Sequence, residues 1–141
     1  MERSKYFSIA AILLAIIVMI MAGSKQTVST PNFTVETISA LCSVSSSNSE
    51  KSDIQIKAEG NNIVVTAPVK TPTPCYIVAG NVKMTGKNID IELTPSPKES
   101  VCIQCVGEVT AKVVVQNLTK GVYGVKLKIP DRMTTNTVII R

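Results

Sequence analysis

From residue 53 onward, apolar and polar residues alternate along the chain in short runs. In "DIQIKAE" (53–59), Ile54 and Ile56 fall on one face of an extended chain, and the polar residues fall on the other. The same period of two returns in "IVVTAP", "VKMTGKNIDIEL", "VCIQCVGEVTAKVVVQ", "VYGVKLKI" and "TNTVII". This alternation predicts β-strands that bury one face, and the stretches rich in Gly and Asn between the runs predict tight turns.

The number and spacing of these runs predict the fold class. Roughly six to eight short strands fit into residues 53–141, and no run has the spacing of an amphipathic helix. We therefore expect an all-β fold, a small antiparallel β-sandwich of the immunoglobulin-like kind. Tyr123 follows the turn "NLTKG", so we expect its hydroxyl to bond back to that turn as a tyrosine corner. The proline-containing stretches "APVKTPTPCY" and "TPSPKES" are expected to be loops.

The N-terminal segment predicts export from the cytoplasm. Residues 6–24 carry no charge, and Arg3 and Lys5 precede them. A run of this length with positive charge before it predicts a single-pass transmembrane helix in the cell membrane, with the C-terminal domain outside the cytoplasm. The alternative is a signal sequence cleaved near Ser24, which would release a secreted protein.

The sequence therefore divides into four segments. Residues 1–5 are the cytoplasmic N-terminus, and residues 6–24 are the transmembrane anchor or signal segment. Residues 25–52 form a Ser/Thr-rich tether, in which "FTVETISAL" could form an edge strand. Residues 53–141 are expected to form the sandwich.

The amino-acid composition limits the kinds of catalytic site and binding partner that the chain can have. The chain of 141 residues is 45% hydrophobic but only 4% aromatic, and it contains no His and no Trp. Without His, a Ser–His or Cys–His catalytic pair within the chain is excluded. The net charge is +5, but the basic residues are spread along the chain, so we expect no nucleic-acid partner. Asp90 and Glu92 share one face of a strand, where a solvated outer surface explains them better than a catalytic carboxylate pair.

Two cysteines three positions apart, Cys102 and Cys105, are compatible with half of a metal site, a redox pair or two structural disulfides. A zinc site would need a second close pair, but Cys42 and Cys75 stand alone, and a redox pair would need a helix after it. We therefore expect structural disulfides, no metal and no cofactor. Residues three apart in a strand point to opposite faces, so each of the two needs a distant partner, either Cys75 or Cys42.

The motifs "TPCYI", "CIQC" and "NLTKGVYGVKLKI" resemble a pattern in small secreted or membrane-anchored immunoglobulin-like β-sandwich modules of bacterial and archaeal envelopes. Those modules carry Pro-Cys followed by an aromatic residue or His, then Cys-x-Gln, then Leu-x-x-Gly-x-Tyr. The resemblance covers roughly residues 73–129. In many such modules the position matching Cys105 is aliphatic, so the resemblance implies that Cys75 pairs with Cys102, which leaves Cys42 for Cys105. It implies no shared reaction.

Two triplets, at Asn32 and Asn117, fit the N-glycosylation sequon. All of these features together favour a non-enzymatic, membrane-tethered module outside the cytoplasm that binds an envelope protein or a glycan, or has a structural role. A subunit of a surface or pilus-like assembly is the first alternative, followed by a protease inhibitor and then a hydrolase. The sequence identifies no partner.

Overall fold

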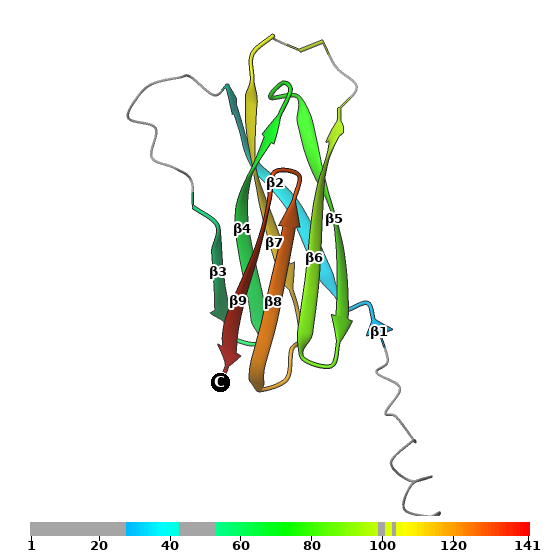
Figure 1. Cartoon of the computed structure of the whole chain (residues 1–141), viewed down its shortest axis with the longest axis vertical. Coiled ribbons are helices and arrows are strands. Elements are labelled where there is room, and N and C mark those ends of the chain that lie inside the picture. Colours follow the sequence, from blue (N-terminus) through cyan, green and yellow to red (C-terminus); the bar gives the residue numbers. More distant parts are fainter. Residues whose placement is uncertain (1–27, 43–52, 99–100, 103) are drawn as a thin grey trace, which may run out of the picture.

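The chain folds into two β-sheets that pack face to face as a sandwich (Figure 1). The computed structural model describes residues 28–42, 53–98, 101–102 and 104–141. These residues form nine strands: β1 (Val28–Ser29), β2 (Phe33–Cys42), β3 (Gln55–Glu59), β4 (Asn62–Thr71), β5 (Tyr76–Thr85), β6 (Asn88–Pro97), β7 (Gly107–Val115), β8 (Gly121–Ile129) and β9 (Arg132–Ile140). The all-β sandwich predicted from the alternation is confirmed.

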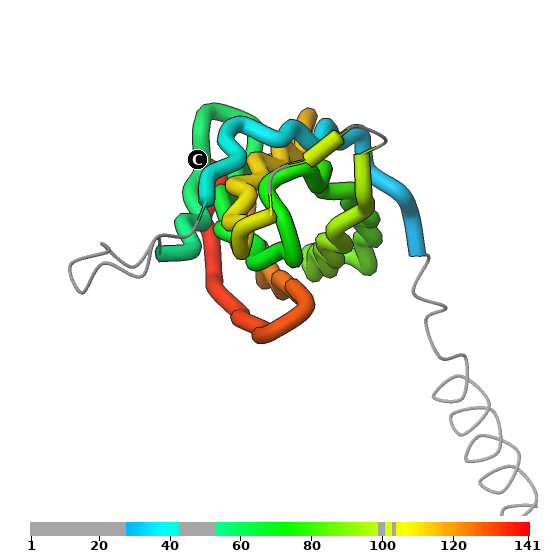
Figure 2. The backbone as a smooth tube through the Cα atoms, turned by 90° about the horizontal axis from the view of Figure 1, so that it is seen from above, coloured from blue at the N-terminus to red at the C-terminus, as the bar shows by residue number. Residues whose placement is uncertain are grey.

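Five strands form one sheet in the order β1-β5-β6-β8-β9, and four form the other in the order β2-β7-β4-β3. Figure 2 looks along the long axis and shows β2 (cyan) on one side of the molecule and the β8–β9 hairpin (orange to red) on the opposite side. The two sheets therefore form separate layers, and the side chains between them form the core.

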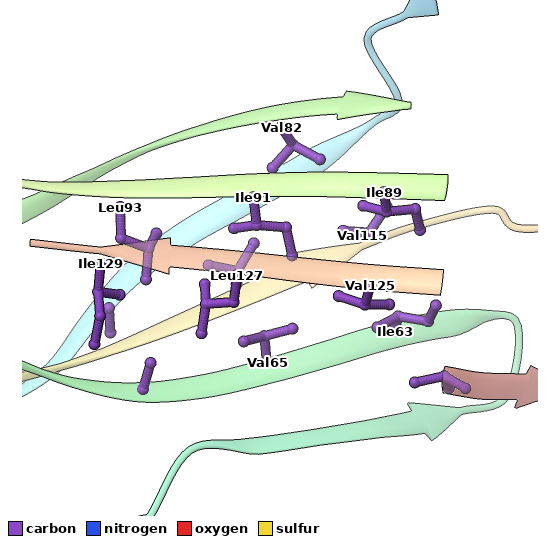
Figure 3. Close-up of a cluster of buried hydrophobic side chains, with 14 of the residues drawn as sticks. Ile63, Val65, Val82, Ile89, Ile91, Leu93, Val115, Val125, Leu127 and Ile129 are labelled. Carbon is purple, nitrogen blue, oxygen red and sulfur yellow. The ribbon is translucent and has the colours of Figure 1, made fainter. Parts of the chain in front are cut away.

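The core is largely aliphatic and lies between the two sheets. Its buried side chains come mainly from every second residue of four strands, as the alternation predicts: Ile63, Val65, Ala67 and Val69 of β4, Ile89, Ile91 and Leu93 of β6, Val109, Ala111, Val113 and Val115 of β7, and Tyr123, Val125, Leu127 and Ile129 of β8. Figure 3 shows Ile91, Leu127 and Val65 pointing into this layer from three different strands. Burial of such side chains is worth roughly 25 cal/mol per Å² of apolar surface.

One pair of neighbouring strands is parallel, which departs from the wholly antiparallel sandwich expected from the sequence. Residues 88–92 of β6 pair in parallel with residues 124–128 of β8. Between these strands the chain crosses to the other sheet as β7, runs back along the molecule, and crosses again. Because two crossovers and one reversed strand separate them, β8 runs in the same direction as β6.

Three prolines that we expected in loops lie inside strands: Pro68 in β4, and Pro95 and Pro97 in β6. Val78 of β5 is opposite Pro95, and its N–H donates to the Thr37 hydroxyl at 3.2 Å instead of to β6. Opposite residues of an antiparallel pair direct their N–H groups either both toward or both away from each other. Because the Val78 N–H points away from β6, the Pro95 nitrogen points away from β5. It faces the side on which β8 no longer pairs with β6, so the N–H that proline lacks removes no hydrogen bond from the sheet.

The segment from 25 to 52, which the sequence suggests as a tether, contributes strands to both sheets. β1 pairs with β5, and β2 pairs with β7 along its length, forming the edge strand that "FTVETISAL" suggested. A register shift between Thr37 and Ser39 changes which residues face inward. Val35, before the shift, packs against the core, whereas Ile38 and Leu41 are exposed. The folded region therefore includes residues before 53.

The N-terminal residues 1–5, the apolar run at 6–24 and the suggested cleavage position near Ser24 lie outside the described residues. In the part of the chain that the structure describes, no helix is long and apolar enough to span a membrane.

The strands run along one long axis, so the molecule has two ends (Figure 1). We call one end the base: it holds β1, the β5–β6 turn, the β7–β8 loop and the end of β9. There Val28 pairs with Thr85, and Gly121 pairs with Ile140. We call the other end the stapled end: it holds the end of β2, the β4–β5 loop and the β6–β7 loop.

Candidate functional site

Both disulfides lie at the stapled end. Cys42–Cys105 joins the last residue of β2 to the β6–β7 loop across 63 residues of sequence, and Cys75–Cys102 joins the β4–β5 loop to the same loop across 27 residues. This is the pairing that the resemblance implies. Cys102 and Cys105 lie in a loop and not in a strand, which corrects the premise of our argument from strand faces. None of the four cysteines is free.

Beneath the disulfides, the β4–β5 loop packs tightly against the start of β7. A Cβ atom added at Gly107 would collide with the main chain of Thr73. The Thr71 hydroxyl donates to the Thr73 carbonyl at 2.7 Å, and the Lys98 N–H donates to the Cys75 carbonyl at 3.0 Å. Covalent bonds, hydrogen bonds and close packing therefore join the described residues of these loops to one another and to β7.

Each of the four cysteines has an exposed, large apolar residue within two positions of it in the sequence. The exposed fractions are 67% for Leu41, 45% for Ile77, 104% for Val101 and 60% for Val106. Leu41 adjoins Cys42, Ile77 follows Cys75 by two, Val101 adjoins Cys102, and Val106 adjoins Cys105. The stapled end therefore presents apolar side chains to solvent from both sheets and from the β6–β7 loop.

A groove of about 470 Å³ opens at the same end, between β2 and β5. Its lining is mostly apolar, and Lys98 is the charged residue in it; the lining residues are Thr37, Ala40, Pro74, Cys75, Tyr76, Ile77 and Lys98. β1 pairs only with the last two residues of β5, so this groove lies beside the part of β5 that β1 leaves open. Apolar concavities with few polar groups are typical of recognition sites.

A second surface, on the outer face of the five-stranded sheet, gathers charged side chains. It forms a shallow depression of about 220 Å³ lined by Asn81, Lys83, Asp90, Ile91, Glu92, Lys126 and Lys128. Lys128 Nζ lies 2.7 Å from Glu92 Oε1. The hydrogen bond and charge of Lys128, with a further contribution from Lys83, hold the pKa of Glu92 below its usual value.

These contacts fit the solvated outer face that the sequence predicts for Asp90 and Glu92. A general acid at neutral pH needs its pKa raised, not lowered. Within the described ranges, His, Cys, Asp and Glu side chains do not gather in any group of three or more that could hold a metal ion. The charged surface therefore offers ion pairs at the surface of a sheet, and the stapled end is the stronger candidate for recognition.

The residues singled out at the base also come together. The Tyr123 hydroxyl donates to the Thr119 carbonyl at 2.9 Å, which is the bond that the tyrosine-corner interpretation expects. Asn32 and Asn117 are both exposed, and the Gln116 N–H donates to the Asn32 carbonyl at 2.8 Å. The two sequons, which lie far apart in the sequence, are thus neighbours at the base.

Sequence reasoning missed the apolar surface of the stapled end. The one available signal was the spacing in "FTVETISAL", where Val35, Ile38 and Leu41 recur every third residue and cannot all face the same side of a strand. No family model, curated protein or solved structure matches this chain, so its function is inferred from its own residues.

Proposed function

We propose that this protein is a non-enzymatic binding module, displayed outside the cytoplasm on an N-terminal membrane anchor, that recognises an envelope protein or glycan through its stapled end. The observation that carries this proposal is the set of four exposed apolar side chains beside the four cysteines, Leu41, Ile77, Val101 and Val106.

Single exposed apolar residues are ordinary on protein surfaces, whereas four of them at one end of the molecule supply apolar area of the kind that interaction surfaces use. Loops that are free to move would lose conformational entropy when a partner orders them. Disulfides remove much of that cost in advance, so fixed loops bind more tightly for the same contact area. The two bridges thus support both the fold and the presentation of this surface.

The two disulfides indicate an oxidising compartment outside the cytoplasm. That location is consistent with the uncharged run at residues 6–24, which we propose as the anchor. The Tyr123–Thr119 bond further supports an immunoglobulin-like arrangement of the sandwich.

The proposal is tested by affinity capture from native membranes, using the tagged full chain extracted in mild detergent with its disulfides intact. We expect the chain to retain a discrete protein or glycan, and we expect Ile77→Asp with Val106→Asp to abolish retention. Charged side chains at those positions disrupt an apolar contact without entering the core, because both residues are exposed.

The matched control carries Val122→Asp with Ile139→Asp, two apolar residues at the base that are 55% and 54% exposed, and it is compared in the same detergent, where no bilayer contacts the base. This variant should retain the partner as the unsubstituted chain does. Equal retention by both variants, or loss only in the control, would show that the stapled end is not the recognition surface.

A further inference from the structure

We propose that the base of the sandwich rests on an anionic lipid surface, with Val122 and Ile139 at the level of the headgroups and Lys120 and Arg141 contacting their phosphates. This inference rests on the membrane anchor of the proposed function and specifies how the module is oriented on it. Three features of the base support it independently: the length of chain before β1, the exposed apolar residues and the charges.

The chain leaves little room between the anchor and the sandwich. The uncharged run ends at Ser24, and Val28 already pairs with Thr85 in the five-stranded sheet. Four Cα–Cα steps span at most about 14 Å. The headgroup layer takes up about 5–8 Å of that distance on each side of the hydrocarbon. Val28 therefore lies at most about 10 Å beyond the headgroups, so the tether keeps the base close to the bilayer and within reach of contact.

Apolar side chains are exposed at this end. Val122 of β8 and Ile139 of β9 lie directly opposite each other on the outer face of their sheet, and they are 55% and 54% exposed. Val28 of β1 is 65% exposed. Apolar groups that would be costly in water are stabilised when they enter the boundary between headgroups and acyl chains.

Positive charge surrounds these apolar residues. Lys120 lies in the loop before β8, Arg141 follows β9, and Lys87 lies in the β5–β6 turn. The Lys87 ammonium donates to the Lys120 carbonyl at 2.7 Å and lies 5.1 Å from the centre of the Tyr123 ring, so its charge is fixed in place. Such charges are attracted to anionic lipids within a Debye length of the surface.

The acidic residue at the end of β3, Glu59, does not cancel this field. Its carboxylate is paired with Lys57 at 2.7 Å, and the hydrogen bond and charge of Lys57 hold the pKa of Glu59 below its usual value. The pair as a whole is neutral. The base therefore presents a net positive surface around an apolar pair, which is the composition of a surface that binds anionic membranes.

The orientation has a consequence for the other end. A strand of ten residues spans about 33 Å, and β5 and β6 each have ten residues between the two ends. With its base on the headgroups, the module holds the stapled end about 33 Å above them, where a partner reaches it without contacting lipid.

Single tryptophan substitutions test the orientation, because the chain has no Trp of its own. The full chain is reconstituted into phosphatidylcholine vesicles with and without phosphatidylglycerol, and brominated lipids serve as quenchers. The variants are Val122→Trp and Ile139→Trp. The matched control is Met133→Trp, which lies in β9 on the same face, is 61% exposed, and belongs to the opposite end.

We expect brominated lipids to quench the tryptophan fluorescence of the Val122→Trp and Ile139→Trp variants and to leave the control unaffected. Quenching in these two variants no greater than in Met133→Trp would overturn the inference. Flotation of the same vesicles distinguishes failure of the orientation from failure of the proposed function. A chain that does not float with the vesicles has no anchor, and both proposals fail. A chain that floats but shows no difference in quenching refutes the orientation alone.

The charges are tested in the Val122→Trp background by adding Lys120→Gln and Arg141→Gln. Each basic residue near an anionic surface favours contact by about fivefold, so we expect quenching to fall in vesicles with phosphatidylglycerol and to stay constant in those without it. The control, Lys70→Gln with Lys98→Gln at the stapled end, should change neither. Equal quenching in both lipids for every variant would exclude recognition of anionic headgroups.

Discussion

Tyr123 is buried in a largely aliphatic core, and its hydroxyl lies 2.9 Å from the Thr119 carbonyl. Replacing Tyr123 by Phe keeps the ring in place and removes this polar contact. A neutral hydrogen bond contributes about 1 kcal/mol net, so we expect Tyr123→Phe to lower the free energy of unfolding in urea by about 1 kcal/mol. Tyr76→Phe is the control, because the Tyr76 hydroxyl forms no hydrogen bond within the described residues. An equal loss in both variants would contradict a corner at Tyr123.

Gly107 is a second residue whose identity the structure explains. Its missing Cβ lets the main chain of Thr73 cross the start of β7. We expect Gly107→Ala to destabilise the protein by more than about 2 kcal/mol, since overpacking against main chain forces a backbone shift that costs about 1–3 kcal/mol or more. Gly124→Ala is the control, because its nearest neighbour is the flexible end of Asn88. Similar melting temperatures for the two variants would show that the loop adjusts freely.

At the scale of elements, the alternation of residues predicted β4, β6, β7 and β8 well because every second residue is buried along most of each strand. It failed at the strand ends, where Pro95 and Pro97 occupy a part of β6 that no longer pairs with β8. It also failed at the register shift of β2, which exposes Leu41. Both features depend on which strands are neighbours, and a single sequence does not contain that information.

The candidate site, like the fold, could be predicted from the sequence only in part. The sequence and the resemblance together identified the four cysteines and implied their pairing. The exposure of Val101 and Val106, and the approach of Asn32 to Asn117, follow only from how the loops and sheets are arranged. Composition does not distinguish an exposed valine from a buried one, so the apolar surface could not be predicted.

The Cys42–Cys105 bridge should act mainly through β2, since it fixes the end of this edge strand. On the chain-entropy estimate, closing a loop of this length contributes about 4 kcal/mol. We expect Cys42→Ser with Cys105→Ser to lower the free energy of unfolding by up to that amount, and to speed hydrogen exchange in β2 more than in β8. The control, Cys75→Ser with Cys102→Ser, should destabilise similarly on this estimate but spare β2. Unchanged exchange in β2 would contradict this role.

At the scale of the whole molecule, the described strands from β1 onward make up a sandwich with its own core. We expect residues 28–141 to fold without the preceding segment, as measured by circular dichroism. A chain beginning at residue 53 lacks β1 and β2, uncovers the edge of β7 and leaves Cys105 without its partner. We expect that shorter chain to be unstable even with Cys105→Ser. If it proves as stable as residues 28–141, β2 is dispensable.

The two ends of the molecule carry different surfaces, and this difference is the central claim of the account. The base has apolar residues surrounded by positive charge, beside the point where the described chain begins at Val28. The stapled end has apolar residues on loops fixed by two disulfides. One end therefore suits a lipid surface, and the other suits a partner outside it.

The most direct test is photo-crosslinking in native membranes, with a photoreactive phenylalanine derivative placed at Val106 or at Val122. Both residues are exposed, 60% and 55%, so each should tolerate the substitution. We predict that position 106 forms a discrete adduct with a protein or glycan and that position 122 forms adducts with lipid. A partner adduct from position 122 with none from position 106, or no partner adduct from either, would contradict the account.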